Sequence, residues 1–120
     1  KKLLYIEDNP ANLRLIQKLV YSHCHLEFID AHSAEIGLPL AASQQPALIL
    51  MDINLPGMNG FEALAALKSN PLTQDIPVIA ITANAMSSDT ERGKAAGFVD
   101  YLTKPLDVKY FMATLDQLLS

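Results

Sequence analysis

Short apolar runs alternate along the chain with longer segments in which apolar residues recur every three or four positions. The short runs are typical of buried strands, and the longer segments are typical of amphipathic helices. The predicted strands are 3–6, 26–29, 47–51 and 76–81, and the segment 98–102 includes a fifth strand. Strands that alternate with helices in this way predict an α/β protein, a five-stranded parallel sheet with helices on both faces.

Capping residues support the predicted helices. Asn is a favourable N-cap, and Pro is well tolerated at the first helical position. Helix starts are predicted at Asn9-Pro10, Ser33, Ser88–Glu91 and Asp107. Gly97 ends the helix that follows Ser88. A third helix, with Phe61, Leu64 and Leu67 on one face, follows the turn-rich segment 55–60.

One proline conflicts with this pattern. Pro39 lies inside the second predicted helix. Because proline lacks a backbone N–H and crowds the preceding turn, we expect it to kink or divide that helix.

Composition narrows the class of protein. The 120 residues fit one domain spanning 1–120, and the net charge of −4 with no basic cluster disfavours direct nucleic-acid binding. No apolar run reaches the ~20 residues of a membrane span, so we expect no membrane contact. The single cysteine, Cys24, favours a reducing cytoplasmic setting. The missing initiator Met suggests a domain cut from a longer protein.

Polar residues collect where the predicted strands end. Glu7 and Asp8 follow the first strand, Asp52 the third, Thr82 the fourth and Lys104 the fifth. In open parallel sheets, ligands bind outside the carboxyl ends of the strands, near the switch in strand order. We therefore expect these side chains to meet in one crevice.

Three neighbouring carboxylates require a compensating cation or a proton. Two charges ~5 Å apart at an effective dielectric near 20 repel by about 3 kcal/mol. Mg²⁺ would relieve this repulsion, and it commonly accompanies phosphoryl groups. Asp52 could then act as a carboxylate nucleophile, with Lys104 and Thr82 contacting phosphoryl oxygens.

At this point the sequence resembles a known family. Glu7-Asp8, Asp52, Thr82-Ala83 and Lys104-Pro105 stand in the order and spacing of a response-regulator receiver domain, the CheY-like, flavodoxin-like fold of two-component signalling. The segment 55–60 resembles the turn that follows the phosphorylated aspartate in that family. The resemblance covers essentially the whole chain.

The resemblance implies a role for each acidic residue. Asp52 is the phosphoacceptor, and Glu7 and Asp8 hold Mg²⁺, with Asp8 as the direct ligand and Glu7 acting through water. The backbone carbonyl of Asn54 completes the metal site.

The resemblance also implies a conformational switch. Thr82 moves toward the phosphoryl group, Tyr101 turns inward in response, and Lys104 contacts the phosphoryl oxygens. The phosphoryl donor is a histidine kinase or a histidine phosphotransfer protein. The domain regulates a partner or an attached kinase or output domain, and a homodimer could form through the face between the fourth and fifth helices.

Other interpretations of single residues stay open. Glu7-Asp8 could simply cap the first helix, where negative charge is favourable. Asp52 could be a turn residue, and Tyr101 a packed aromatic rather than a switch.

Two other functions compete with the switch. One is a phosphohydrolase with the same aspartyl-phosphate chemistry, but haloacid-dehalogenase-like phosphatases place a second acid two residues after the nucleophile, where this chain has Asn54. An inert receiver-like scaffold is the other alternative, although none of the acids is lost. The stretch Tyr5–Arg14 looks like receivers attached to hybrid sensor histidine kinases.

Overall fold

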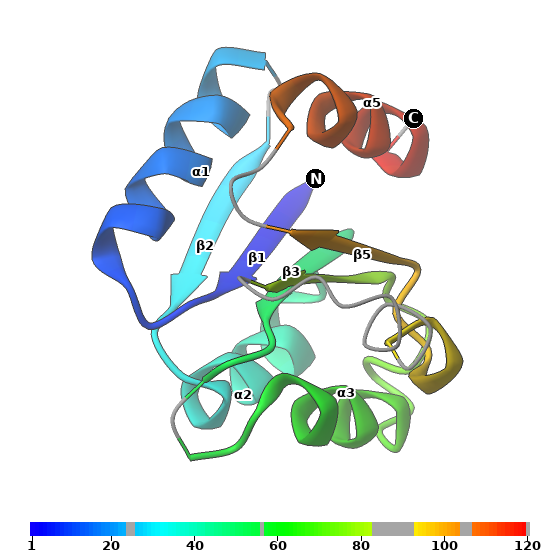
Figure 1. Ribbon diagram of the computed structural model, residues 1–120. Helices are drawn as coiled ribbons and strands as arrows, with labels where there is room; N and C mark the ends of the chain where they lie inside the picture. The colour runs from blue at the N-terminus through cyan, green and yellow to red at the C-terminus, as the bar shows by residue number, and fades with distance from the viewer. Residues whose placement is uncertain (24–25, 56, 83–92, 104–106, 120) are drawn as a thin grey trace.

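The computed structural model describes residues 1–23, 26–55, 57–82, 93–103 and 107–119. Nine helices and strands follow one another along the described residues, and Figure 1 shows how they are arranged in space. They are β1 (Lys2–Ile6), α1 (Pro10–His23), β2 (Glu27–Ala31), α2 (Ala34–Gln44), β3 (Leu48–Asp52), α3 (Gly60–Lys68), β4 (Val78–Thr82), β5 (Asp100–Thr103) and α5 (Val108–Leu119). A short helical segment, residues 93–96, precedes β5.

The strands form one parallel sheet in the order β2-β1-β3-β4-β5. This arrangement confirms the predicted α/β class and the flavodoxin-like fold. The chain leaves β1 toward one edge and returns to β3 on the other side of it, so the strand order switches between β1 and β3. Parallel sheets of this type bind ligands at that switch, outside the carboxyl ends of the strands.

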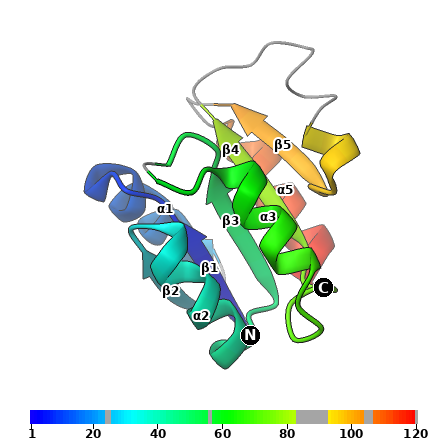
Figure 2. The same ribbon diagram turned by 90° about the horizontal axis from the view of Figure 1, so that it is seen from below.

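Alternate residues of each strand face opposite layers of helices. One hydrophobic cluster joins Leu4, Ile49 and Met51 to residues of α2 and α3, such as Leu64. The other cluster joins strand residues such as Leu50 to α1 and α5. Figure 1 accordingly shows α1 and α5 on one side of the sheet and α2 and α3 on the other, and Figure 2 shows the second side from below. Because β3 is covered on both faces, all of its residues are buried.

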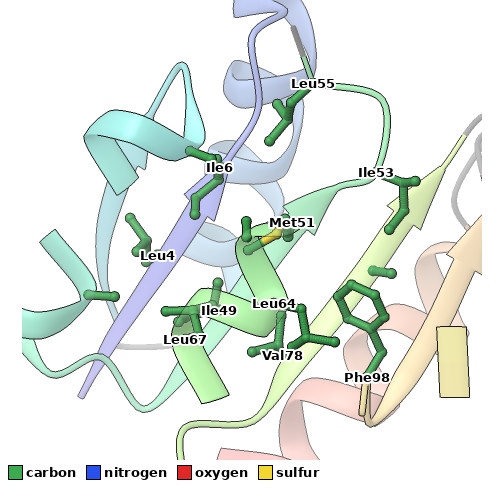
Figure 3. Packing of buried hydrophobic residues seen from close by; sticks show 14 of the residues in the cluster. Leu4, Ile6, Ile49, Met51, Ile53, Leu55, Leu64, Leu67, Val78 and Phe98 are labelled. Carbon is green, nitrogen blue, oxygen red and sulfur yellow. The ribbon is translucent and has the colours of Figure 1, made fainter. Parts of the chain in front are cut away.

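The first cluster extends beyond the sheet to the loop after β3. Figure 3 shows Ile53 and Leu55 on the segment that leaves β3, together with Ile6 on β1 and Met51 on β3. All four side chains are buried in this cluster. Apolar packing therefore holds the start of the loop that follows Asp52.

The predicted caps are confirmed where the structure describes them. Ala11 donates its N–H to Asn9 Oδ1 at 2.9 Å, Ile36 to Ser33 Oγ at 3.2 Å and Tyr110 to Asp107 Oδ1 at 3.2 Å. Gly97 has a φ of +121° and ends the helical segment before β5, as expected of a glycine stop. The predicted capping box at 88–91 lies outside the described residues.

The second helix is not divided at Pro39, whereas the expected kink there stays a prediction. α2 runs without interruption from Ala34 to Gln44 with Pro39 inside it. Proline removes the hydrogen bond to the carbonyl of Glu35, but Glu35 lies in the exposed first turn, where water can hydrate that carbonyl. The predicted bounds of two strands also shift: β2 begins at Glu27 and β4 at Val78.

The part of the chain that the structure describes contains no helix with the length and apolarity needed to cross a membrane.

Candidate metal and phosphoacceptor site

Three carboxylates meet at the carboxyl end of the sheet. Glu7 and Asp8 directly follow β1, and Asp52 is the last residue of β3, which pairs with β1. One carboxylate oxygen from each of the three residues lies within 4.8 Å of the others. The structure therefore brings together the three acids that the sequence predicted, at the switch in strand order.

The burial of these acids makes their proximity costly. Glu7 is 0% exposed and Asp52 is 5% exposed, whereas Asp8 lies at the surface. Their negative field reaches the core: burial first, and then the charges of Glu7 and Asp52, raise the pKa of Tyr5 far above its ordinary value. Buried like charges are tolerated when a cation is shared among them.

The donor set fits Mg²⁺. Three carboxylates offer only hard oxygen ligands, and one of them opens to solvent, from which Mg²⁺ keeps several of its waters. Among the residues that the structure describes, no thiolate or imidazole belongs to this cluster, so its chemistry does not favour a softer metal.

Asn54 links the end of β3 to the end of β4. Its backbone N–H donates to Asp52 Oδ1 at 3.0 Å, and its side-chain amide donates weakly to Thr82 Oγ1 at 3.4 Å. Thr82 is buried at the end of β4, beside the end of β3. The structure thus places Asp52, Asn54 and Thr82 side by side, as predicted, while metal binding by the Asn54 carbonyl stays a prediction.

A residue that the sequence analysis missed also contacts the site. Asn12, in the first turn of α1, donates its side-chain amide N–H to Glu7 Oε1. Helical side chains tilt toward the helix N-terminus, so a polar residue at this place is directed back toward the strand end that precedes the helix. That spacing was the available signal for finding it.

The loop after Asp52 is tied to α2 by a second unpredicted contact. Glu35 Oε1 accepts a hydrogen bond from the Met58 N–H at 3.2 Å and lies beside Gly57, whose φ of +73° favours glycine. Hydrogen bonds from its own backbone N–H and from Met58 hold the pKa of Glu35 below its ordinary value. The loop is therefore fastened at its far end as well as by its apolar start.

Tyr101 and Lys104 are the two remaining predicted residues, and the structure describes Tyr101. Tyr101 is buried in β5, and its ring packs edge-on against Phe98 with the centroids 6.4 Å apart. Its Cα lies in register with Ala80, two residues before Thr82. Lys104 and the adjoining Pro105 lie outside the described residues.

The buried position of Tyr101 depends on the absence of a side chain at Gly93. A Cβ added at residue 93 would lie 2.2 Å from Tyr101 Cδ2, so the ring would have to move. We expect Gly93→Ala to displace the Tyr101 ring and to lower the free energy of unfolding by about 1–3 kcal/mol, as overpacking does. Urea denaturation and nuclear Overhauser effects between Tyr101 and Phe98 measure both changes.

The control for this prediction removes the obstructed ring. In the Tyr101→Ala background, Gly93→Ala should no longer destabilise the protein, because nothing large stands in the way of the added methyl group. Retention of wild-type stability and of the Tyr101–Phe98 contacts in Gly93→Ala alone would contradict the prediction.

Comparison with known proteins agrees with this geometry. Residues 3–116 match the family described as the response regulator receiver domain. The chain is 34% identical over 119 residues to Protein PilH of Pseudomonas aeruginosa, covering 99% of this chain and 98% of PilH. It is 39% identical over 115 residues to the polar-differentiation response regulator DivK of Brucella ovis, covering 96% of this chain and 93% of DivK.

A similar solved structure carries a metal at its site. The receiver domain of the sensor histidine kinase PA1611 from Pseudomonas aeruginosa PAO1 has a magnesium ion coordinated in its active site cleft. It superposes on this chain with a TM-score of 0.89 and 30% identity, covering 100% of this chain and 98% of the other. Matches in both sequence and structure thus span nearly the whole chain, and the chain belongs to the response-regulator receiver domain family of two-component phosphorelay signalling.

Proposed function

We propose that Asp52 is the phosphoacceptor of this receiver domain and that Glu7 and Asp8 hold Mg²⁺ beside it. The observation that carries this proposal is the meeting of three carboxylates within 4.8 Å at the carboxyl end of the sheet. Asp52 is the last residue of β3, a strand that is buried on both faces. We further propose that residues 1–120 act as one phosphoacceptor unit.

The chemistry is a transfer of one phosphoryl group to a carboxylate. An Asp52 carboxylate oxygen forms a bond to phosphorus, and the bond from phosphorus to the imidazole nitrogen of a donor phosphohistidine breaks. The imidazole leaves with the bonding electron pair. The Asn54 N–H on Asp52 Oδ1 orients the carboxylate for this attack. When bound, Mg²⁺ offsets the negative charge that the phosphoryl group brings to the acids.

The response to phosphorylation passes through neighbouring residues. Thr82 is proposed to donate its hydroxyl to a phosphoryl oxygen on Asp52, and the hydrogen bonds from Asn54 to both side chains support this proposal. Tyr101, on the adjacent strand, is proposed to be the aromatic residue whose position reports this contact, and Lys104 to neutralise the phosphoryl charge. Phosphorylation then biases an existing equilibrium between two states of the domain.

The partner of this chain follows from the same chemistry. We propose that a histidine kinase or a histidine phosphotransfer protein supplies the phosphoryl group. We propose that this domain is attached to a sensor histidine kinase, as the name of the PA1611 receiver indicates for that protein. A homodimer through the face that runs from the fourth predicted helix to the fifth helix, α5, stays a prediction.

The proposal is tested by intact mass spectrometry of the chain after incubation with acetyl phosphate. With Mg²⁺ we expect a mass increase of one phosphoryl group, and with EDTA in place of Mg²⁺ we expect none. The reason is that the phosphoryl group would otherwise enter a cluster that already holds three carboxylates. A folded chain that binds Mg²⁺ but gains no mass from acetyl phosphate or from a phosphorylated histidine phosphotransfer protein would favour the inert scaffold.

A further inference from the structure

The side chain of Asn12 has no assigned role, yet it contacts a buried acid of the site. Its amide Nδ2 donates to Glu7 Oε1 across five residues of sequence, from the first turn of α1 to the end of β1. Glu7 is completely buried, whereas Asn12 is partly exposed. We propose that Asn12 is a positioning residue for Mg²⁺ binding, which fixes the Glu7 carboxylate toward Asp8 and Asp52. This inference rests on the proposed function of the acids.

The geometry of a carboxylate explains how one hydrogen bond can act in this way. The group is planar and rigid, so fixing Oε1 with the Asn12 amide also fixes the direction of Oε2. Without this donor, repulsion from the other two carboxylates favours rotation of Glu7 away from them. Groups that hold a metal ligand in place from behind commonly raise metal affinity, and their loss lowers it about 10- to 100-fold.

The chemical type of residue 12 suits this role. An amide presents the positive end of a dipole to the Glu7 carboxylate without adding a full charge. A lysine or arginine at the same place would also bind Glu7, but its positive charge would oppose the binding of a divalent cation nearby. A neutral donor orients the acid and leaves the negative charge of the site intact.

A purely structural role for Asn12 is less consistent with its surroundings. The start of α1 is already capped by Asn9, whose Oδ1 accepts the Ala11 N–H at 2.9 Å and whose backbone oxygen accepts the Leu13 N–H at 3.1 Å. Asparagine is also a poor helix former, so the helix itself gains nothing from it at this position. The contact with Glu7 is the feature that an asparagine here provides.

The test is a titration of the purified chain with Mg²⁺ alone, followed by amide chemical shifts in NMR. Asn12→Leu keeps the size of the side chain and removes the donor. We expect its dissociation constant for Mg²⁺ to rise about 10-fold or more relative to the unaltered chain. Gln17→Leu, the same kind of change on α1 at a partly buried position, is the matched control and should leave the dissociation constant unchanged.

A double-mutant cycle separates positioning from a general effect on the helix. If Asn12 acts through Glu7, Asn12→Leu should have no effect on Mg²⁺ affinity in a Glu7→Gln background. The rate at which Asn12→Leu takes up a phosphoryl group from acetyl phosphate should be low at low Mg²⁺ and should return to the wild-type rate at saturating Mg²⁺. A slower rate at saturating Mg²⁺ would instead indicate a disturbed acceptor and would overturn the inference.

The outcomes distinguish this inference from the proposed function. If the unaltered chain does not bind Mg²⁺, the proposed metal site is wrong and the inference falls with it. If the unaltered chain binds Mg²⁺ and Asn12→Leu binds it equally well, the metal site stands and the positioning role is wrong. An equal loss of affinity with and without Glu7 would also overturn the role.

Discussion

Asp52→Asn is expected to abolish phosphoryl uptake by the chain. An amide oxygen is not a competent nucleophile toward phosphorus, whereas the carboxylate at the end of β3 is. The substitution is nearly isosteric, and its side-chain oxygen can still accept the Asn54 N–H that Asp52 Oδ1 accepts at 3.0 Å. It also removes one of three mutually repelling charges, so the fold should be retained. Intact mass after acetyl phosphate treatment with Mg²⁺ measures the effect.

The control for Asp52→Asn is the same change at a distant surface carboxylate. Asp75, exposed in the connection between α3 and β4, is suitable, and Asp75→Asn should be modified like the unaltered chain. A full adduct on Asp52→Asn that still requires Mg²⁺ would show that another carboxylate of the cluster is the acceptor. Asp8, the exposed member of the cluster, would then be the first residue to map.

Phe111→Ala is expected to produce the largest loss of stability among the single substitutions considered. Phe111 is 0% exposed on the inner face of α5, in the cluster that also contains Tyr5, Ile81 and Leu115. Truncating a buried aromatic residue leaves a cavity that the surroundings fill only in part, at a cost of about 3–5 kcal/mol. That loss is a large share of the ~5–15 kcal/mol that stabilises a typical domain. Urea denaturation followed by circular dichroism measures it.

The neighbouring residue gives a matched aromatic truncation. Tyr110 is 51% exposed on the outer face of α5, and its hydroxyl donates to Asp100 Oδ2 at 2.6 Å. Tyr110→Ala removes a similar ring but little buried area, so we expect a loss near the ~0.5–1.5 kcal/mol of one hydrogen bond. Equal losses in Phe111→Ala and Tyr110→Ala would contradict the buried position of Phe111.

The sequence predicted the acid cluster because the positions of these acids depend only on the order and direction of the strands. Glu7 and Asp8 follow one apolar run and Asp52 ends another, and parallel strands place such positions at the same edge of the sheet. No knowledge of side-chain packing is needed for that step. The same reasoning placed Thr82 correctly beside Asp52 at the end of the adjacent strand.

Predictions that depended on the surroundings of a residue were less successful. Pro39 is unfavourable in an isolated helix, yet α2 continues through it, because packing of its buried residues against the sheet outweighs one missing hydrogen bond. β2 and β4 each begin one or two residues later than their apolar runs. A strand begins where its neighbour offers a hydrogen-bonding partner, and that partner is distant in sequence.

The sequence by itself determined the class of fold, the order of its elements and the acids at the ends of its strands, because periodicity, caps and strand ends are local features of the chain. Only the tertiary structure decided which side chains support them. The contacts of Glu35 with Met58 and of Gly93 with Tyr101 depend on how each helix is placed against the sheet. That placement is set by the packing of the two apolar clusters as a whole, and no local pattern in the sequence encodes it.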